Sequence, residues 1–575
     1  MKMNQLQLMV YGEGLSEISV TATGIEIVSV QTVPNSNYAF VDLKITPTAT
    51  VGNHPLVFHK GKESVSVNFP ILERKNDPQH HQGFGPEDVI YLITPDRFAN
   101  GNAENDKLAN HLNEFNPSAP EKRHGGDLQG IIDNMDYFEN LGVTALWLNP
   151  ILENDGINSY HGYKTTDFYQ IDPRFGTNEV YLNLVETAHK RGIKIIFDHI
   201  NNHIGFRHSW VQSPPMKDWF NGTVEKHLLH KHYKSSVLDP HADPANIAAL
   251  KDFWFVDLMP DLNQRNPFLA TYLTQNMIWW MEYTGLDGIR EDTYPYPDQA
   301  FMSEWAKTIL EEYPQSNIVG EVWALSTPFI AGFQKETYFP REFDTNLPSV
   351  MDFPLMKAYR KYMRDEAKLQ DIYEVFADDF VYTDLDNVMT FLDNHDVTRA
   401  IYDAQGATDR VKQCLAMLLT TRGIPQLFYG TELNMKGGER HIDLREDFPG
   451  GFPYHKRSAF AAEGRTAEEA DMFTFTRQWL QLRKKYPALS KGKMTQFAPK
   501  NGFYSYFKSL EDQEIWVVLN GGDEKQVVDI SEMTHRFEDV TALRNLISEE
   551  NFPMNNSFKL ELQPRGVQAF LLMKK

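Results

Sequence analysis

The stretch LDGIRED at 286–292, followed by TYPYPD, sets both the expected fold and the expected chemistry of this chain. Its apolar residues end in charge, which predicts a buried strand with polar side chains at its carboxyl end. Side chains at i and i+2 of a strand share a face, so Arg290 and Asp292 should point into one cavity. A neighbouring guanidinium holds a carboxylate ionised and oriented, as a carboxylate nucleophile requires. An isolated Arg-x-Asp pair is more often a surface ion pair, so the interpretation needs support from elsewhere in the chain.

Eight apolar runs, separated by longer helical segments, occupy the middle of the chain. They are VIYLITP (89–95), VTALWLNP (143–150), IKIIFD (193–198), LDGIRED (286–292), NIVGE (317–321), SVMDF (349–353), VMTFLDNHD (388–396) and IPQLFYG (424–430). Near-continuous apolar runs between helices predict a parallel sheet covered on both faces, and eight of them predict an α/β fold, the (β/α)8 TIM barrel. The alternative is an open doubly wound sheet, but no GxGxxG motif follows any run.

The sequence on both sides of these runs is typical of β-structure. Short alternating segments rich in β-branched residues fill the first 85 residues and return from about 491. A polar, aromatic stretch without helical periodicity separates the third and fourth runs. We therefore expect an N-terminal Ig-like β-sandwich at 1–85, a catalytic barrel at 86–203 and 261–490, a small inserted domain over the barrel mouth at 204–260, and a C-terminal β-sandwich at 491–575.

Composition limits the partners of the chain. The formal charge of −22 excludes nucleic acid and acidic membrane surfaces as favourable partners. No apolar run reaches the roughly 18–20 residues of a membrane span. The single cysteine, Cys414, excludes a disulfide framework. The chain opens on strand-like sequence without a signal-peptide pattern, and we expect a periplasmic location, with the cytoplasm as the alternative.

Three acids stand at the ends of three different runs: Asp292, Glu321 and Asp396. Glu321 follows a very apolar strand, where desolvation should raise its pKa, whereas Arg290 should keep Asp292 ionised. One protonated and one charged carboxyl group are what glycoside hydrolysis requires. His395, beside Asp396, suits hydrogen bonding to sugar hydroxyls. Any one of these acids alone would more often be a structural residue at a strand end.

The third run continues into FDHINNH at 197–203, which contains Asp198, Asn202 and His203. Asp198 can stabilise loops without contacting a ligand. His199 and His203 have the i, i+4 spacing of a zinc pair. They lack the glutamate of HExxH and follow a strand, so we do not favour zinc.

Four motifs in this order resemble the signature regions of the α-amylase family, glycoside hydrolase family 13. They are DxxxNH at 198–203, GIRED at 288–292, GEVW at 320–323 and FLDNHD at 391–396. MPDLN at 259–263 and SYHGYKTTDFYQIDPRFGT at 159–177 are similar to further family motifs near the inserted domain and after the second strand. The resemblance covers about 89–575.

The resemblance implies a retaining double displacement. It assigns Asp292 as the nucleophile, Glu321 as the general acid/base, and Asp396 as a residue that binds sugar hydroxyls and stabilises the transition state. Arg290 would orient Asp292. The other substrate contacts that it implies are His161, Tyr163, Asn202, His203, His395 and Arg399.

Within the family, the extra N-terminal sandwich and MPDLN resemble the cyclomaltodextrinase, neopullulanase and maltogenic amylase group. The expected substrates are therefore the α-1,4 bonds of cyclodextrins and short malto-oligosaccharides. Alternatives are a neopullulanase or α-amylase acting on pullulan or starch, a transglycosylase, and an inactive glucan-binding relative, which would lack the three acids. The N-terminal sandwich could bind glucan, brace the barrel or pair two subunits, so a homodimer is one expected assembly.

Calcium is the expected metal, in a structural role. Many α-amylases carry a Lys-His pair after the nucleophile that helps to hold calcium, but Pro295 and Tyr296 occupy those positions. A different loop resembles a calcium site of cyclodextrin glucanotransferases. Its hard oxygen ligands would come from Asn100, Asn102, Asn105, Asp106, Gly125 and Asp127. A polar, Asx-rich turn without an ion is the alternative.

Overall fold

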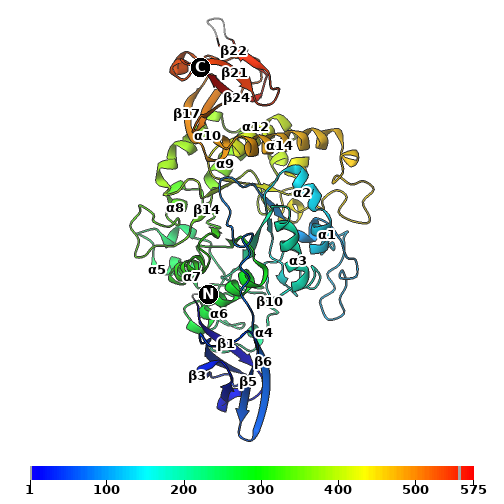
Figure 1. Ribbon diagram of the computed structural model, residues 1–575, viewed down its shortest axis with the longest axis vertical. Helices are drawn as coiled ribbons and strands as arrows, with labels where there is room; N and C mark the ends of the chain where they lie inside the picture. The colour runs from blue at the N-terminus through cyan, green and yellow to red at the C-terminus, as the bar shows by residue number, and fades with distance from the viewer. Residues whose placement is uncertain (1–2, 555–558) are drawn as a thin grey trace.

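The computed structural model describes residues 3–554 and 559–575, and its ribbon is elongated (Figure 1). A closed barrel with its surrounding helices occupies the middle. The N-terminal strands form one end of the molecule and the C-terminal sheet forms the other. Within the described residues, no helix is both long and apolar enough to cross a membrane.

The barrel contains eight parallel strands in one closed ring, which confirms the predicted fold class. Each predicted run corresponds to one of them. The strands are β7 (Ile90–Ile93), β8 (Ala145–Leu148), β11 (Lys194–His199), β12 (Gly288–Glu291), β13 (Asn317–Gly320), β14 (Ser349–Met351), β15 (Val388–Phe391) and β16 (Ile424–Phe428). Nearly every residue in them is buried, because helices cover the outside and side chains fill the inside.

Helices between the strands surround the barrel. The longer ones begin with side-chain caps, such as Asn266 before α6 and Asp298 before α7, which satisfy free backbone N–H groups. The helices are α1 (Leu128–Asp133), α2 (Met135–Leu141), α3 (Asn178–His189), α6 (Pro267–Thr284), α7 (Gln299–Glu312), α8 (Thr327–Ala331), α9 (Phe353–Met363), α10 (Leu369–Ala377), α11 (Ala400–Asp403), α12 (Thr408–Thr420), α13 (His441–Leu444), α14 (Ala467–Lys485) and α15 (Ala488–Lys491).

The register of the barrel strands aligns the polar residues at their carboxyl ends. Asp198 of β11 lies opposite Arg290 of β12, and His199 lies opposite Glu291. Glu291 in turn lies opposite Gly320 of β13, directly before Glu321. Because neighbouring residues of a strand face opposite sides, this register places Asp198 and Arg290 on one side of the wall, and His199 and Glu291 on the other.

The segment between β11 and β12 contains little regular structure. Its elements are α4 (Ser209–Gln212), the 3-10 turn η3 (Lys234–Val237) and α5 (Pro244–Lys251). Isolated bridges join His203 to Asp261 and Phe220 to Leu262, so the segment leaves and rejoins the barrel at adjacent positions. We refer to residues 204–260 as the insert.

Two three-stranded antiparallel sheets form the N-terminal domain. Their strands are β1 (Gln5–Tyr11), β2 (Ser19–Ala22), β3 (Glu26–Thr32), β4 (Tyr38–Lys44), β5 (Gly52–Lys60) and β6 (Glu63–Ile71). A small apolar core that includes Val41, Leu43 and Leu56 lies within this domain. The backbone of Gln7 on β1 exchanges two hydrogen bonds of 2.8 Å with the side chain of Gln275 on α6, which joins the domain to the barrel.

A six-stranded sheet and a separate strand pair form the C-terminal domain. The large sheet contains β17 (Lys493–Lys500), β18 (Phe503–Leu510), β19 (Gln513–Asn520), β21 (Val540–Asn545), β22 (Asn551–Pro553) and β24 (Val567–Lys574), and the pair contains β20 (Gln526–Val527) and β23 (Glu561–Leu562). Lys508 of β18 is only 1% exposed, and its Nζ donates to the carbonyl oxygen of Thr421 after α12, at 3.2 Å. A lysine is thus buried between this sheet and the barrel helices.

We predict that Lys508 makes the stability of the protein depend on pH. Burial, with a smaller contribution from the charge of Arg483, lowers the pKa of Lys508 to about 7. The ordinary lysine pKa is about 10.4, so between these values the unfolded chain binds one more proton and stability rises with pH. The Lys508→Met variant lacks this dependence. Its Tm relative to wild type should be higher at pH 6.5 than at pH 9.5, by about 1–4 °C. A Tm difference that does not vary with pH would contradict the prediction.

Candidate active site

The three predicted catalytic acids line one cavity of about 550 Å³ at the carboxyl ends of the barrel strands. Asp292 follows β12 and Glu321 follows β13, while Asp396 lies in the loop after β15. His161, Tyr163 and His203 line the same cavity. Segments far apart in the sequence therefore meet where a barrel enzyme carries its chemistry.

Arg290 lies at the centre of a carboxylate cluster and is fully buried. Its Nη1 is 2.8 Å from Oδ1 of Asp198 and 2.7 Å from Oδ1 of Asp292, and its Nη2 is 2.9 Å from Oε2 of Glu321. One guanidinium thus fixes three carboxylates from three neighbouring strands. The backbone N–H of Thr293 also donates to Oε2 of Glu321, at 3.0 Å. Thr293 has a left-handed φ of 44°, a strained conformation of the kind found at functional sites.

This cluster carries more negative than positive charge. Burial raises the pKa of Asp198 to about 6, although Arg290 opposes the shift. Burial also raises the pKa of Asp292 well above its usual range, and the charges of Glu321 and Asp198 add to the effect while Arg290 opposes it. We expected Arg290 to keep Asp292 ionised. In the structure, Arg290 is shared among three buried carboxylates, so its charge offsets the burial of Asp292 only in part and the pKa of Asp292 stays raised.

Asp396 has a different environment. Burial acts to raise its pKa, but the cationic forms of neighbouring groups, His395, His441 and Arg445, together hold it below its usual range. Burial itself lowers the pKa of His395 to about 3, so that imidazole is neutral at pH 7. At pH 7, the permanent charge of Arg445, whose Nη2 is 3.0 Å from Oδ1 of Asp396, is therefore the main cause of the lowered pKa of Asp396. Asp396 is the carboxylate that stays ionised.

Tyr163 connects these two groups. Its hydroxyl donates to Oδ2 of Asp198 at 2.9 Å and is 2.7 Å from Nε2 of His395. Its ring is nearly parallel to that of His395, with an angle of 6° between the planes and 5.5 Å between the ring centres, and lies at 25° to that of His161, at 5.8 Å. Nε2 of His203 is 3.2 Å from the carbonyl oxygen of Tyr163. The three imidazoles thus surround a fixed aromatic ring at the base of the cavity.

Three predicted substrate contacts, Asn202, His395 and Arg399, are not among the residues that line the cavity. Arg399 is fully buried: its Nε donates to the carbonyl oxygen of Leu444, its Nη1 donates to that of Tyr429, and its guanidinium stacks on the ring of Phe428. Asn202 is buried as well, and its side-chain amide nitrogen is 3.2 Å from Nδ1 of His203. Both residues support the loops that carry the cavity residues. Asn202 still acts on the site, because it orients His203.

Several cavity residues were not identified from the sequence. Arg445 and His441 come from the loop after β16, and His232 and Lys234 come from the insert. These residues lie outside the strand ends, so strand periodicity gives no indication of them. The sequence does give an indication at Trp323, two residues after Glu321, because an aromatic ring just after a strand end suits a sugar; this side chain is half-buried and lines the cavity. Nζ of Lys234 is 4.8 Å from the centre of that ring.

The two histidines of the alternative zinc pair have separate partners. Nδ1 of His199 is 2.8 Å from Oε2 of Glu291, and the His199 ring stacks on Trp305 of α7. His203 faces the cavity instead. The carbonyl oxygens of His199 and Glu291 accept the backbone N–H groups of Asp292 and Glu321, each at 2.9 Å. This buried pair therefore supports the backbone that carries two of the acids.

The residues of the predicted calcium loop converge after β7. Asp127 caps α1 and accepts hydrogen bonds from the backbone N–H groups of Gly101 and Asn102. Nδ2 of Asn100 donates to Oδ1 of Asp106 at 3.0 Å. A Cβ atom on Gly125 would lie 2.3 Å from Oδ1 of Asp106, so only glycine fits there.

Two observations test whether this loop suits a cation. Oδ1 of Asn105 is buried without a hydrogen-bond partner, and such an orphaned oxygen is suited to a metal ion. Burial, together with the charges of Asp127 and Asp96, raises the pKa of Asp106 to about 6. The loop therefore concentrates carboxylate charge that neighbouring cations do not neutralise. Its carboxylate and amide oxygens fit calcium.

The geometry as a whole defines a class of protein. A closed parallel barrel carries paired carboxylates, a shared buried arginine and neutral imidazoles at the carboxyl ends of its strands. These groups define a barrel enzyme that uses carboxyl groups for acid–base and nucleophilic chemistry.

Comparison with known proteins identifies the family. Residues 92–512 match the model of the alpha amylase catalytic domain. Residues 1–75 match the cyclomaltodextrinase N-terminal domain, and residues 494–567 match the cyclo-malto-dextrinase C-terminal domain. The chain therefore belongs to the alpha-amylase family and is a glycoside hydrolase.

Individual relatives agree with this assignment. A cyclomaltodextrinase of Geobacillus thermopakistaniensis is 30% identical over 79% of this chain and 72% of its own length. The match to the beta/alpha-amylase of Paenibacillus polymyxa has 28% identity and covers 84% of this chain but only 37% of that longer protein. The crystal structure of an Anoxybacillus alpha-amylase superposes with a TM-score of 0.72 at 30% identity, over 85% of this chain and 98% of that one. Other relatives are named neopullulanase and maltogenic alpha-amylase.

We predict that Arg445 is required to keep Asp396 ionised at the pH of the reaction. Replacing it with methionine removes the cation closest to Asp396, so the pKa of Asp396 should rise and the carboxylate should become protonated at a higher pH. The value of kcat/KM for 4-nitrophenyl α-maltoside should fall at least tenfold at pH 7, and its acidic limb should move up by about one pH unit.

The matched control for this change is Arg440→Met. Arg440 lies in the same loop, its side chain is 70% exposed, and it pairs with Asp443. If Arg445→Met and Arg440→Met gave the same pH profile, Arg445 would have no role in the ionisation of Asp396.

Proposed function

We propose that this enzyme hydrolyses the α-1,4-glucosidic bonds of cyclomaltodextrins and short linear maltodextrins with retention of anomeric configuration. One observation carries the proposal: Asp292 and Glu321 both contact the guanidinium of Arg290 beside the same cavity. Carboxyl groups held this close suit the separation of roughly 5–5.5 Å used by retaining enzymes, rather than the wider separation of inverting ones.

The reaction has two steps. Glu321 donates a proton to the glycosidic oxygen while Oδ of Asp292 attacks the anomeric carbon, so the bond to the leaving sugar breaks and a glycosyl ester forms. Glu321 then takes a proton from water, which attacks the same carbon and releases Asp292. Positive charge developing on the sugar favours the ionised form of Asp292, which counters the raised pKa of this carboxyl group in the free enzyme.

Asp396 and the imidazoles would act on the sugar in the cleaved position. Asp396 is ionised and lines the cavity, so it can accept hydrogen bonds from two hydroxyls and stabilise the oxocarbenium-like transition state. His203 has its pKa lowered to about 4, mainly by burial, and therefore offers neutral hydrogen bonding at pH 7. The ring of Tyr163 gives the sugar a flat apolar surface.

The preference for cyclic substrates is supported by the flanking domains. The N- and C-terminal parts of the chain match domain models described for cyclomaltodextrinases, and several relatives carry that name. The insert contributes His232, Lys234, Phe255, Val256 and Met259 to the cavity. A cavity bounded on this side favours short or ring-shaped glucans over the middle of a long polymer.

We predict the following product profile on β-cyclodextrin, soluble starch and pullulan, measured side by side over time. β-Cyclodextrin should be opened fastest and converted to maltose and glucose, with starch cleaved at least tenfold more slowly. Fast starch cleavage with inert cyclodextrin would make the enzyme an α-amylase, and rapid release of panose from pullulan would make it a neopullulanase. Products longer than the substrate would identify a transglycosylase.

Two further measurements test the stereochemistry and the roles of the acids. The first product detected by NMR should be the α-anomer, and a β-anomer would contradict retention. Asp292→Asn should lower kcat by at least a factor of 10⁴ without a change in the circular dichroism spectrum. Asp243→Asn is the matched control, because Asp243 caps α5 of the insert and asparagine caps equally well.

We also propose that the loop after β7 holds a structural calcium ion. The ligands would be oxygens of Asn100, Asn102, Asn105, Asp106 and Asp127 and the backbone carbonyl of Gly125. The ion would neutralise the carboxylates of the loop and fix it against α1. The reaction above does not require it.

The calcium proposal predicts a pH-dependent gain in stability. Millimolar CaCl2 should raise Tm by about 2 °C or more at pH 7.5 relative to excess EGTA, since a ligand that binds only the folded state stabilises it. The gain should decline below pH 6, as Asp106 becomes protonated. Asp106→Asn should lose the gain, and the exposed Asp133→Asn should keep it. An equal Tm with CaCl2 and EGTA would contradict the proposal.

A further inference from the structure

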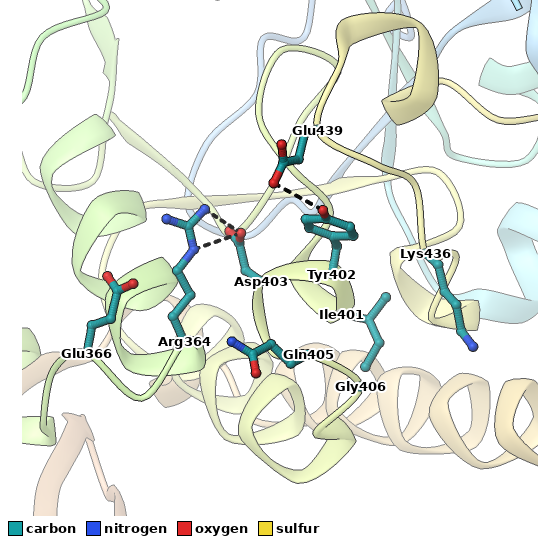
Figure 2. A pocket seen from close by; sticks show the side chains of 9 residues that line it. All are labelled: Arg364, Glu366, Ile401, Tyr402, Asp403, Gln405, Gly406, Lys436 and Glu439. Carbon is teal, nitrogen blue, oxygen red and sulfur yellow. Dashed lines mark hydrogen bonds and ion pairs between the residues drawn. The ribbon is translucent and has the colours of Figure 1, made fainter.

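A second cavity, of about 640 Å³, shares no lining residue with the catalytic cavity, and we refer to it as the side cavity. Figure 2 shows the side chains that line it, with Arg364 on one side, Lys436 on the other and Tyr402 between them. They come from the end of α9, from α11 and from the loop after β16. The volume lies within the range of roughly 300–1,000 Å³ that is typical of sites for small ligands.

The chemistry of the side cavity favours an uncharged ligand rich in hydroxyl groups. Its buried carboxylate, Asp403, is already neutralised by Arg360 at 2.5 Å and Arg364 at 2.6 Å, and it accepts a hydrogen bond from Thr398 at 2.7 Å. The remaining polar groups are the hydroxyl of Tyr402, the exposed amide of Gln405, the cationic Lys436, and the carboxylates of Glu366 and Glu439. Hydrogen-bond donors and acceptors are therefore abundant, while neither sign of charge dominates.

Tyr402 supplies a flat surface in this cavity. Its side chain is 38% exposed, although it stands between the buried Ile401 and Asp403. The hydroxyl of Tyr402 donates to Oε1 of Glu439 at 3.3 Å, which holds the ring in place (Figure 2). An oriented ring with an apolar face and a polar edge, surrounded by donors and acceptors, suits a pyranose ring.

The side cavity adjoins the catalytic cavity. Glu439 lines the side cavity and His441 lines the catalytic one, and both belong to the loop after β16. Two residues of extended chain span at most about 7 Å, so one thickness of loop separates the two cavities. A similar link exists on the other side, where the segment from Asp396 of the catalytic cavity leads into α11 with Tyr402.

We propose that the side cavity is a second glucan-binding site, which holds a distal stretch of a longer α-glucan chain whose end lies in the catalytic cavity. This inference rests on the proposed function, since it takes the substrate to be an α-glucan. The site would add affinity for long chains through a shared molecule, with little effect on chains too short to reach it.

The test compares Tyr402→Ala with wild type on a long and a short substrate. For amylose of more than about 20 glucose units, KM should rise about 3- to 10-fold with kcat unchanged, which is the effect expected for the loss of one stacking surface. For maltotriose, both constants should stay the same. Tyr338→Ala is the matched control, because Tyr338 is 73% exposed and is not among the residues that line either cavity.

A binding measurement separates this inference from the proposed function. Retention on immobilised amylose, measured with all three proteins carrying Asp292→Asn so that the matrix is not cleaved, should be weaker for Tyr402→Ala than for wild type at position 402 and for Tyr338→Ala. Equal retention of all three proteins, or an equal rise in KM on both substrates, would overturn the inference. Failure of the wild type to cleave any α-glucan would contradict the proposed function, while the retention assay would still test the side cavity.

Discussion

The guanidinium of Arg290 is the interaction on which the active site depends. It is fully buried, and it contacts carboxylates from β11, β12 and β13 at once. Removing charged groups from water costs several kcal/mol for each ion, so such a cluster persists only where every member has partners. Trp147 and Tyr163 supply some of them, because each donates a hydrogen bond to Oδ2 of Asp198 at 2.9 Å. The loss of Arg290 would leave three buried carboxylates without a common cation.

The two sides of the barrel wall stabilise this cluster in different ways. On the inner side, Arg290 collects the acids. On the outer side, His199 pairs with Glu291 against Trp305, and the carbonyl oxygens of that pair hold the backbone N–H groups of Asp292 and Glu321. Adjacent residues of β11 and β12 thus fix the side chains and the backbone of the same site. The alternation of a strand, one residue in and one residue out, is what permits both.

Much of the fold was predictable, because long periodic patterns are physical requirements of buried parallel strands. Seven of the barrel strands lie within the predicted runs, and β11 extends one residue beyond its run, to His199. Strand β5, GNHPLVFHK, has a weaker pattern, because Gly52, His54 and Pro55 interrupt the alternation. The structure tolerates Pro55 since β5 pairs there only with β6, and pairing with β2 begins at Leu56. In the site, the acids were predictable from strand ends, whereas Arg445 and Lys234 come from loops without periodicity. Arg399, a predicted substrate contact, donates to the backbone carbonyl oxygens of Leu444 and Tyr429, and its position near Asp396 in the sequence does not reveal these partners.

The bridge between His203 and Asp261 has an evolutionary consequence. The segment it closes begins and ends at neighbouring points on the barrel rim, so the chain can lengthen or shorten there without any strand having to move. The entropic cost of closing such a segment grows only slowly with its length. The insert, which borders the catalytic cavity, can therefore change in evolution independently of the barrel. Such changes alter which glucans enter the cavity, while the barrel strands and the catalytic acids stay in place.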